Sequence, residues 1–223
     1  MTEPAPDPYL RLIAARASAT AATWLSDRLA ALDAASFVAA HAGAGRRLGA
    51  EAVRLSESER QSVLAAGLLD PSGWPLSRVA RVLIVRELCR RTPAESHVGL
   101  VERLFQRGDN AERAALLQGL CLLPSAERFT PVAIDACRSH VADVFEAIAC
   151  ENPYPARYFP DESFNQMVLK AFFTGVAVER VYGLADRRGP DLKRMAEAYA
   201  SERRAAGRSV PADLHLATGD RET

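Results

Sequence analysis

The sequence predicts an all-α protein of stacked helical hairpins, resembling a short HEAT-like α-solenoid array. Apolar residues recur at the three- and four-residue spacing of amphipathic helices, and no segment alternates at period two for long enough to form a strand. Four successive helices of roughly 12–20 residues follow one another, joined by short polar turns. Paired helices recur every 35–45 residues or so, which is the HEAT and armadillo size range, although no repeated sequence signature marks them.

Periodicity alone sets the first two helices. The segment Tyr9–Leu32 is rich in alanine and unbroken by glycine or proline, so a helix is expected along it. A second, shorter helix is expected to follow Asp33 and to run through Phe37 to Ala42. Glycines at positions 43, 45 and 49 are then expected to loosen the chain, because glycine disfavours regular helix.

Capping and turn signals set the helices that follow. Ser56 and Glu59 have the spacing of a capping box, which predicts a helix from Glu57 to Leu68. The segment Asp70–Gly73 is a strong turn signal. Ser77 is then expected to cap a helix that runs to about Arg91.

Three further helices complete the regular part of the chain. Pro93, suited to the first helical position, begins a helix that Gly108 ends. Asp109 begins the next by the same capping logic. One long helix is expected over Thr130–Ala149.

The stretch Glu151–Pro160 interrupts this rhythm. Its three prolines prevent a helix from continuing, and its three aromatic residues indicate a packed, ordered loop. Helices are expected again over roughly Asp161–Thr174 and Asp191–Ala206.

Composition limits the classes of function. The chain has 223 residues with 28 Lys+Arg and 28 Asp+Glu, so its net charge is zero. A neutral chain has no global field to steer it onto polyanions, and nucleic-acid binding is therefore not expected. This length suits one domain over residues 1–223.

Cysteine and histidine spacing favours neither a metal site nor a cofactor. The four cysteines form no C-x-x-C pair and lie in apolar stretches, where reduced thiols act as small hydrophobes. The four histidines are far apart in sequence. The segment Met1–Pro8 lacks the basic and apolar regions of a signal peptide, and no run is long and apolar enough to span a membrane. We therefore expect a cytoplasmic protein without a cofactor.

Helical projection singles out two residues of the Asp161–Thr174 helix. Asn165 falls in the middle of an apolar arc, where an unpaired amide costs about 1–3 kcal/mol. It is expected either to tie the proline-rich loop to the helix or to contact a ligand. Lys170 lies at the edge of this arc, as a surface lysine or as a charge partner for a phosphate or carboxylate.

Charged residues near two other apolar faces are further candidates. Asp143 and Glu146 belong to an acidic stripe on the Thr130–Ala149 helix, either a solvated face or a pair able to hold a divalent ion or serve as acid and base. Glu202 and Arg203 flank the inner face of the last helix, so either could be partly buried with a partner. We expect Asn165 to join the Asn152–Pro160 loop to this pair.

Five segments in order resemble the EboA family over roughly residues 133–216. They are Asp143–Ala149, Asn152–Ala156, Phe164–Ala171, Gly183–Arg188 and Glu202–Pro211. The resemblance implies a bacterial protein encoded in an ebo-type cluster, beside a UbiA-like prenyltransferase, TIM-barrel enzymes and a dehydroquinate-synthase-like protein. Such clusters are linked to making or exporting secondary metabolites, and the resemblance implies no reaction for this chain.

Two functions remain open from the sequence. One is a non-catalytic accessory protein of a secondary-metabolite biosynthesis or export pathway, a helical scaffold whose partners are other proteins of that pathway. The alternative is a small-molecule-binding protein or enzyme with a site around Asn152, Asn165 and Lys170. The candidate ligand- or partner-binding residues are Asp143, Glu146, Asn152, Tyr158, Asn165, Lys170, Glu202 and Arg203.

Overall fold

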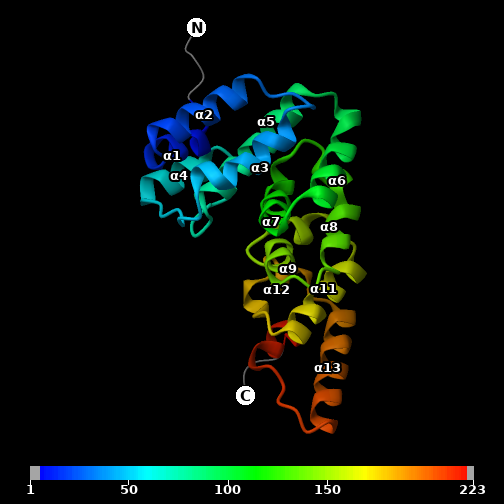
Figure 1. Cartoon of the computed structure of the whole chain (residues 1–223). Helices are drawn as coiled ribbons and strands as arrows, with labels where there is room; N and C mark the ends of the chain where they lie inside the picture. The colour runs from blue at the N-terminus through cyan, green and yellow to red at the C-terminus, as the bar shows by residue number, and fades with distance from the viewer. Residues whose placement is uncertain (1–5, 220–223) are drawn as a thin grey trace. The chain divides into compact units, whose positions relative to one another are not determined.

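The computed structural model describes residues 6–219, which form a succession of helices (Figure 1). Helices hold 72% of these residues and strands hold none, which confirms the predicted all-α class. The chain divides into two compact units, Met1–Phe129 and Thr130–Thr223. The HEAT-like stacking and the single domain over residues 1–223 stay predictions. Residues 1–5, which carry most of the segment judged not to be a signal peptide, lie outside the described part.

Unit 1 consists of seven α-helices and three short 3-10 helices within its described residues. These are α1 (Pro8–Arg16), α2 (Ala19–Ala30), α3 (Phe37–Leu48), α4 (Glu57–Ala65), α5 (Leu76–Arg91), η1 (Ala94–Ser96), α6 (His97–Arg107), α7 (Asn110–Gly119), η2 (Leu120–Leu122) and η3 (Ala126–Phe129).

Helix α5 forms the centre of unit 1. Helices α1, α3 and α7 pack against it, and twelve of its sixteen residues are buried. A helix that is covered all round has no polar face, so even Arg81 and Arg86 lie inside the core. The helix begins at Leu76 after Pro75, so the predicted cap by Ser77 is wrong; Ser77 is itself buried.

Two predictions for the first helices are wrong. The expected helix Tyr9–Leu32 breaks at Ala17, because Ser18 takes an extended conformation and accepts a hydrogen bond from the Ala21 amide, starting α2 anew. Helix α3 continues past Ala42 to Leu48 instead of loosening. Its two internal glycines allow close packing: a Cβ at position 43 would lie 2.9 Å from the Trp24 ring, and one at position 45 would lie 2.7 Å from the Arg81 guanidinium.

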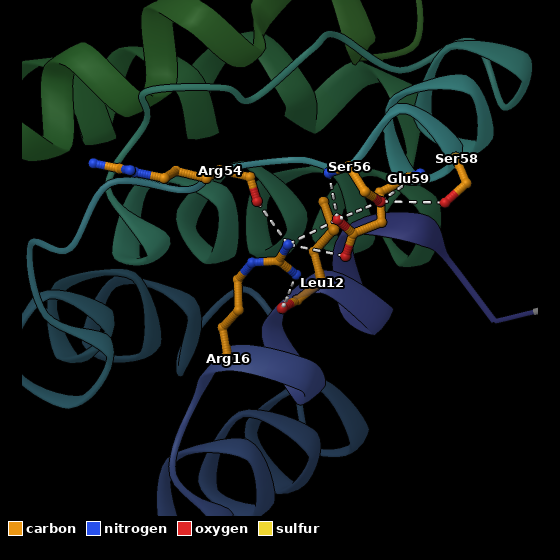
Figure 2. A network of polar contacts seen from close by, with 6 residues as sticks. All are labelled: Leu12, Arg16, Arg54, Ser56, Ser58 and Glu59. Carbon is orange, nitrogen blue, oxygen red and sulfur yellow. Dashed lines mark hydrogen bonds and ion pairs between the residues drawn. The ribbon is translucent and has the colours of Figure 1, made fainter.

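Both predicted capping boxes are confirmed, at Ser56 and at Asp109. The first is tied to α1, as Figure 2 shows. Arg16 Nη2 donates to both carboxylate oxygens of Glu59 at 2.9 Å and to the Arg54 carbonyl at 2.8 Å. One ion pair therefore joins the C-terminal end of α1 to the N-terminal end of α4.

Most α-helices of unit 2 are short, whereas α11 and α13 have 14 and 16 residues. Its described elements are α8 (Thr130–Ala136), α9 (Ala142–Ala149), α10 (Pro153–Tyr158), α11 (Asp161–Thr174), η4 (Val178–Arg180), α12 (Leu184–Arg187), α13 (Pro190–Ala205), η5 (Ala212–Leu214) and α14 (His215–Thr218). The predicted helices over 161–174 and about 191–206 are confirmed as α11 and α13.

The long helix expected over Thr130–Ala149 is wrong, because it divides into α8 and α9. The Lys170 ammonium group donates hydrogen bonds to the carbonyls of Cys137 and Ser139. The Ser139 hydroxyl accepts a hydrogen bond from the Val141 amide. These bonds turn the chain after α8. The acidic stripe predicted along one helix is therefore not formed, and Val141 in this turn is exposed.

The loop expected over Glu151–Pro160 contains a helix, α10, so that prediction is wrong as well. Asn152 caps it, and Pro153 and Pro155 stand in its first turn. Amides of a first turn have no intrahelical partner, so a proline there costs no hydrogen bond. Among the described helices, none is long and apolar enough to cross a membrane.

Candidate functional site

Arg187, the last residue of α12, clamps the C-terminal end of α10. Its guanidinium donates to three main-chain carbonyls, at 2.6 Å to Ala156, 2.8 Å to Phe159 and 3.3 Å to Pro155. It also pairs with Asp161 at 2.9 Å and lies 4.8 Å from the centre of the Phe164 ring. A cation suits this place, because carbonyls at a helix C-terminus lack partners and carry partial negative charge.

Gly183 brings α12 against α10. Its φ of +71° lies in the left-handed region, and a Cβ there would be 2.8 Å from the Cβ of Ala156. Any other residue would therefore suffer both backbone strain and a clash. Together with Arg187, this glycine joins the family-like segment 183–188 to the family-like segment 152–156.

The same α12 region borders a half-open cleft of about 470 Å³. That volume is within the range of small-molecule sites. Its apolar lining is Val178, Val181, Leu184, Ala185 and Leu216, and its polar lining includes Glu179, Tyr182, Asp186 and Arg188. Apolar residues with a few polar groups around them are typical of such sites.

The polar groups of the cleft are exposed and unpaired with one another. Within residues 6–219, no ion pair engages Glu179, Asp186 or Arg188. Arg188 Nη1 donates only a long hydrogen bond, 3.5 Å, to the Leu216 carbonyl. Tyr182 keeps 51% of its surface exposed. These side chains are therefore available to a ligand.

Two predicted site residues hold helices in place. The Asn152 side chain accepts from the Tyr154 amide at 2.9 Å and donates to the Ala147 carbonyl at 2.8 Å, so it caps α10 and ties it to α9. Lys170 Nζ donates to the carbonyls of Cys137 and Ser139 and lies 4.7 Å from the centre of the Phe145 ring. Burial lowers the pKa of Lys170.

The predicted carboxylate pair of α9 is divided. Glu146 binds Arg180 at 2.7 Å, and Arg180 also binds both carboxylate oxygens of Glu151. Hydrogen bonds from Arg180 to these carboxylates raise its pKa. Asp143 is exposed in the first turn of α9, where its charge suits the helix N-terminus.

Asn165 is buried as predicted, with 6% of its surface exposed. Its side chain makes no hydrogen bond within residues 6–219, so the expected junction with the 152–160 segment and the last helix does not form through it. Its amide atoms are not among the fully buried unsatisfied ones, and the amide therefore keeps contact with solvent.

The remaining candidates lie apart from any common hydrogen-bond network. Tyr158 is half-buried, with its ring 4.8 Å from that of Tyr154. Glu202 is exposed and Arg203 is half-buried, so only Arg203 of this pair has the partial burial considered for either residue. Arg203 Nε donates to the Ser209 carbonyl and closes the turn after α13. The sequence analysis did not identify Arg187, because the carbonyls that it binds lie 28 to 32 positions away in the chain.

Cysteines and potential metal ligands are dispersed. Burial raises the pKa of Cys89 and Cys150 to about 11 and that of Cys137 to about 12. Among the residues that the structure describes, no three His, Cys, Asp or Glu side chains group as they would around a metal ion.

Fold and cleft define an all-helical protein that has a cleft of small-molecule size beside α12. The sequence matches the family described as "Metabolite traffic protein EboA" over residues 9–219. The chain belongs to the EboA family, which confirms the resemblance seen over residues 133–216 and extends it through the N-terminal half. Comparison with curated proteins and with solved structures finds no match.

Proposed function

We propose that this chain serves metabolite traffic by binding a small organic molecule in the cleft beside α12. The cleft supports this proposal, because it has a volume of about 470 Å³ and is lined by both apolar and charged residues. The family description, metabolite traffic, supports it. Binding and release, without a chemical step, are the function proposed.

Rigid support of the cleft favours this function. Arg187 and Gly183 fix α12 on α10, and the Asp213 carboxylate accepts from the Val178 amide at 2.8 Å, which fixes η4. A site whose walls are held in place loses less entropy on binding a ligand. The cleft is thus supported on both of its bordering elements.

A cleft-filling substitution tests the proposal. Ala185 is exposed, lies on α12 and lines the cleft, so Ala185→Trp blocks it with little effect on folding. Ala198→Trp, at an exposed position of α13 outside the cleft, is the matched control. Mass spectrometry of molecules released from protein purified from its native host should find them with wild type and Ala198→Trp and lose them with Ala185→Trp. Equal retention by both variants would contradict the proposal.

The accessory role predicted from the sequence is a second candidate. Phe173 favours it, because this aromatic residue on α11 keeps 65% of its surface exposed, edge-on to Tyr199. Exposed aromatic side chains often anchor protein interfaces. Phe173→Ser should then weaken co-purification of proteins encoded in the same cluster while leaving small-molecule binding unchanged. We also propose that the protein performs this role in the cytoplasm.

The alternative site around Asn152, Asn165 and Lys170 receives less support. The polar side-chain atoms of Asn152 and Lys170 form hydrogen bonds with the main chain, and a ligand would have to displace those bonds. The α12 cleft requires no such displacement, which is why we place the ligand there.

A further inference from the structure

The cleft beside α12 carries charges of both signs that leave one another unpaired. Glu179 comes from η4, Asp186 from α12 and Arg188 from the residue that follows α12. Asp186 and Arg188 are only two positions apart, yet no ion pair joins them in the described structure. Opposite charges that line one cleft without meeting leave room for a ligand to bridge them.

Arg188 is held toward α14. Its Nη1 donates to the Leu216 carbonyl, and its Nε lies 3.3 Å from where a Cβ of Gly219 would be. A side chain at position 219 would therefore crowd the guanidinium. The planar guanidinium remains able to offer two parallel N–H donors, the geometry that matches a carboxylate.

We propose that this cleft recognises a small zwitterion, a molecule whose apolar body carries one carboxylate and one ammonium group. The inference rests on the proposed function and names the class of its ligand. Arg188 binds the carboxylate, and Glu179 with Asp186 binds the ammonium group, while the apolar body lies against Val181 and Leu184. The exposed Tyr182 ring adds a face that attracts a cation.

Molecules with a single charge fit this arrangement less well. An anion that pairs with Arg188 also faces two carboxylates, and like charges that are brought together oppose binding. A cation that pairs with the carboxylates leaves Arg188 without a partner. Only a ligand with both charges satisfies all three side chains.

Three probes with the same aromatic body test the ligand class: phenylalanine, phenethylamine and 3-phenylpropionate. Titrated into the full chain and followed by NMR, phenylalanine should bind at least about tenfold more tightly than either singly charged probe, a difference of roughly 1.4 kcal/mol. Arg188→Gln should lower the affinity for phenylalanine to the affinity measured for phenethylamine. The double change Glu179→Gln and Asp186→Asn should lower the affinity for phenylalanine to the affinity measured for 3-phenylpropionate.

Arg194→Gln is the matched control, because Arg194 is an exposed arginine of α13 outside the cleft, and it should leave all three affinities unchanged. Equal binding of the three probes, or tightest binding of a singly charged one, overturns the zwitterion. Absence of binding by all three also overturns it. In each case the proposed function survives if Ala185→Trp still loses the molecules that Ala198→Trp retains, and it fails with the inference if both variants retain them.

Discussion

The two units use the same arginine-rich composition in different ways. In unit 1, α1, α3 and α7 surround the buried helix α5, and two arginines of α5 are paired inside the core. In unit 2, five of the seven described α-helices have eight residues or fewer, so helix ends are frequent, and Lys170, Arg180 and Arg187 bind the main chain or carboxylates near them. Each helix end leaves carbonyls without intrahelical partners, so a unit of short helices needs more cationic side chains to satisfy them.

The buried arginines of unit 1 show the other use. Arg86 pairs with Asp7 at 2.9 Å, near the Tyr9 ring. Arg81 donates to the His41 carbonyl at 3.1 Å and lies 3.9 Å from Glu112. A buried charge needs such partners, and removing one partner leaves the other uncompensated. Unit 1 thus depends on its core, whereas unit 2 depends on its helix ends.

Loss of the Arg187 clamp should have the largest effect on stability. Arg187→Leu leaves three carbonyls and Asp161 without their charged partner and should lower the free energy of unfolding by about 3 kcal/mol. Arg188→Leu, at the exposed neighbouring position, should change it by less than about 0.5 kcal/mol. Urea denaturation compares the two. Equal effects would mean that helix-end contacts do not hold unit 2 together.

The core of unit 1 should respond to acid. Burial, followed by Arg81, lowers the pKa of His41 to about 3, although Asp109 acts in the opposite direction. The pKa of a histidine in the unfolded chain is near 6.5. Below that pH the unfolded chain binds a proton at His41, whereas the imidazole of the folded chain stays neutral. The contribution of neutral His41 to the free energy of unfolding is therefore fully present above pH 6.5 and is lost as the pH falls toward 3. Between pH 7 and pH 5 the free energy of unfolding should fall by about 2 kcal/mol.

Unfolding measured across this pH range checks the His41 prediction. His41→Gln should remove this part of the pH dependence, and His140→Gln, at an exposed position, should keep it. A wild-type slope in the His41→Gln variant would show that the buried imidazole is not its source.

Substitution of Lys170 should lower the free energy of unfolding by less than substitution of Arg187 does. Lys170→Met keeps the apolar stem but loses the donors to the Cys137 and Ser139 carbonyls, which should cost about 1–2 kcal/mol. The other lysine of the chain, Lys193, provides the control. It lies 3.8 Å from Glu197 on the surface of α13, and Lys193→Met should cost less than about 0.5 kcal/mol. Thermal melts that show no difference would remove Lys170 from the set of helix-end contacts.

Asn165 should give the smallest effect. Asn165→Leu removes an amide that has no hydrogen bond, so stability should change by less than about 1 kcal/mol, against the 1–3 kcal/mol expected if the amide were paired. Asn152→Leu removes a buried amide that is bonded on both sides and should cost about 1–3 kcal/mol. A greater loss with Asn165→Leu than with Asn152→Leu would reverse this assignment.

Sequence predicted those features whose partners lie nearby in the chain. The capping boxes at Ser56 and Asp109 involve residues three positions apart, and the burial of Asn165 follows from helical spacing on α11. The break at Ala17 also had a local signal in Ser18, which the apolar periodicity around it outweighed.

Other features depend on residues far apart in the chain. The division of the Thr130–Ala149 segment depends on Lys170, which lies 33 positions beyond the carbonyl of Cys137 that it binds. Arg187 reaches carbonyls about 30 positions away, and those carbonyls need a partner only because α10 ends there. Side-chain roles of this kind follow from the fold, so the α12 cleft could not be predicted from spacing.

We propose that the α12 cleft is where this protein binds a small molecule. Hydrogen–deuterium exchange of the chain purified from its host, before and after removal of its bound small molecules, tests this directly. We expect slower amide exchange at residues 178–188 and near Leu216, the segments that line the cleft, when the molecules are bound. Protection confined to other segments, or no change on removal, would contradict it.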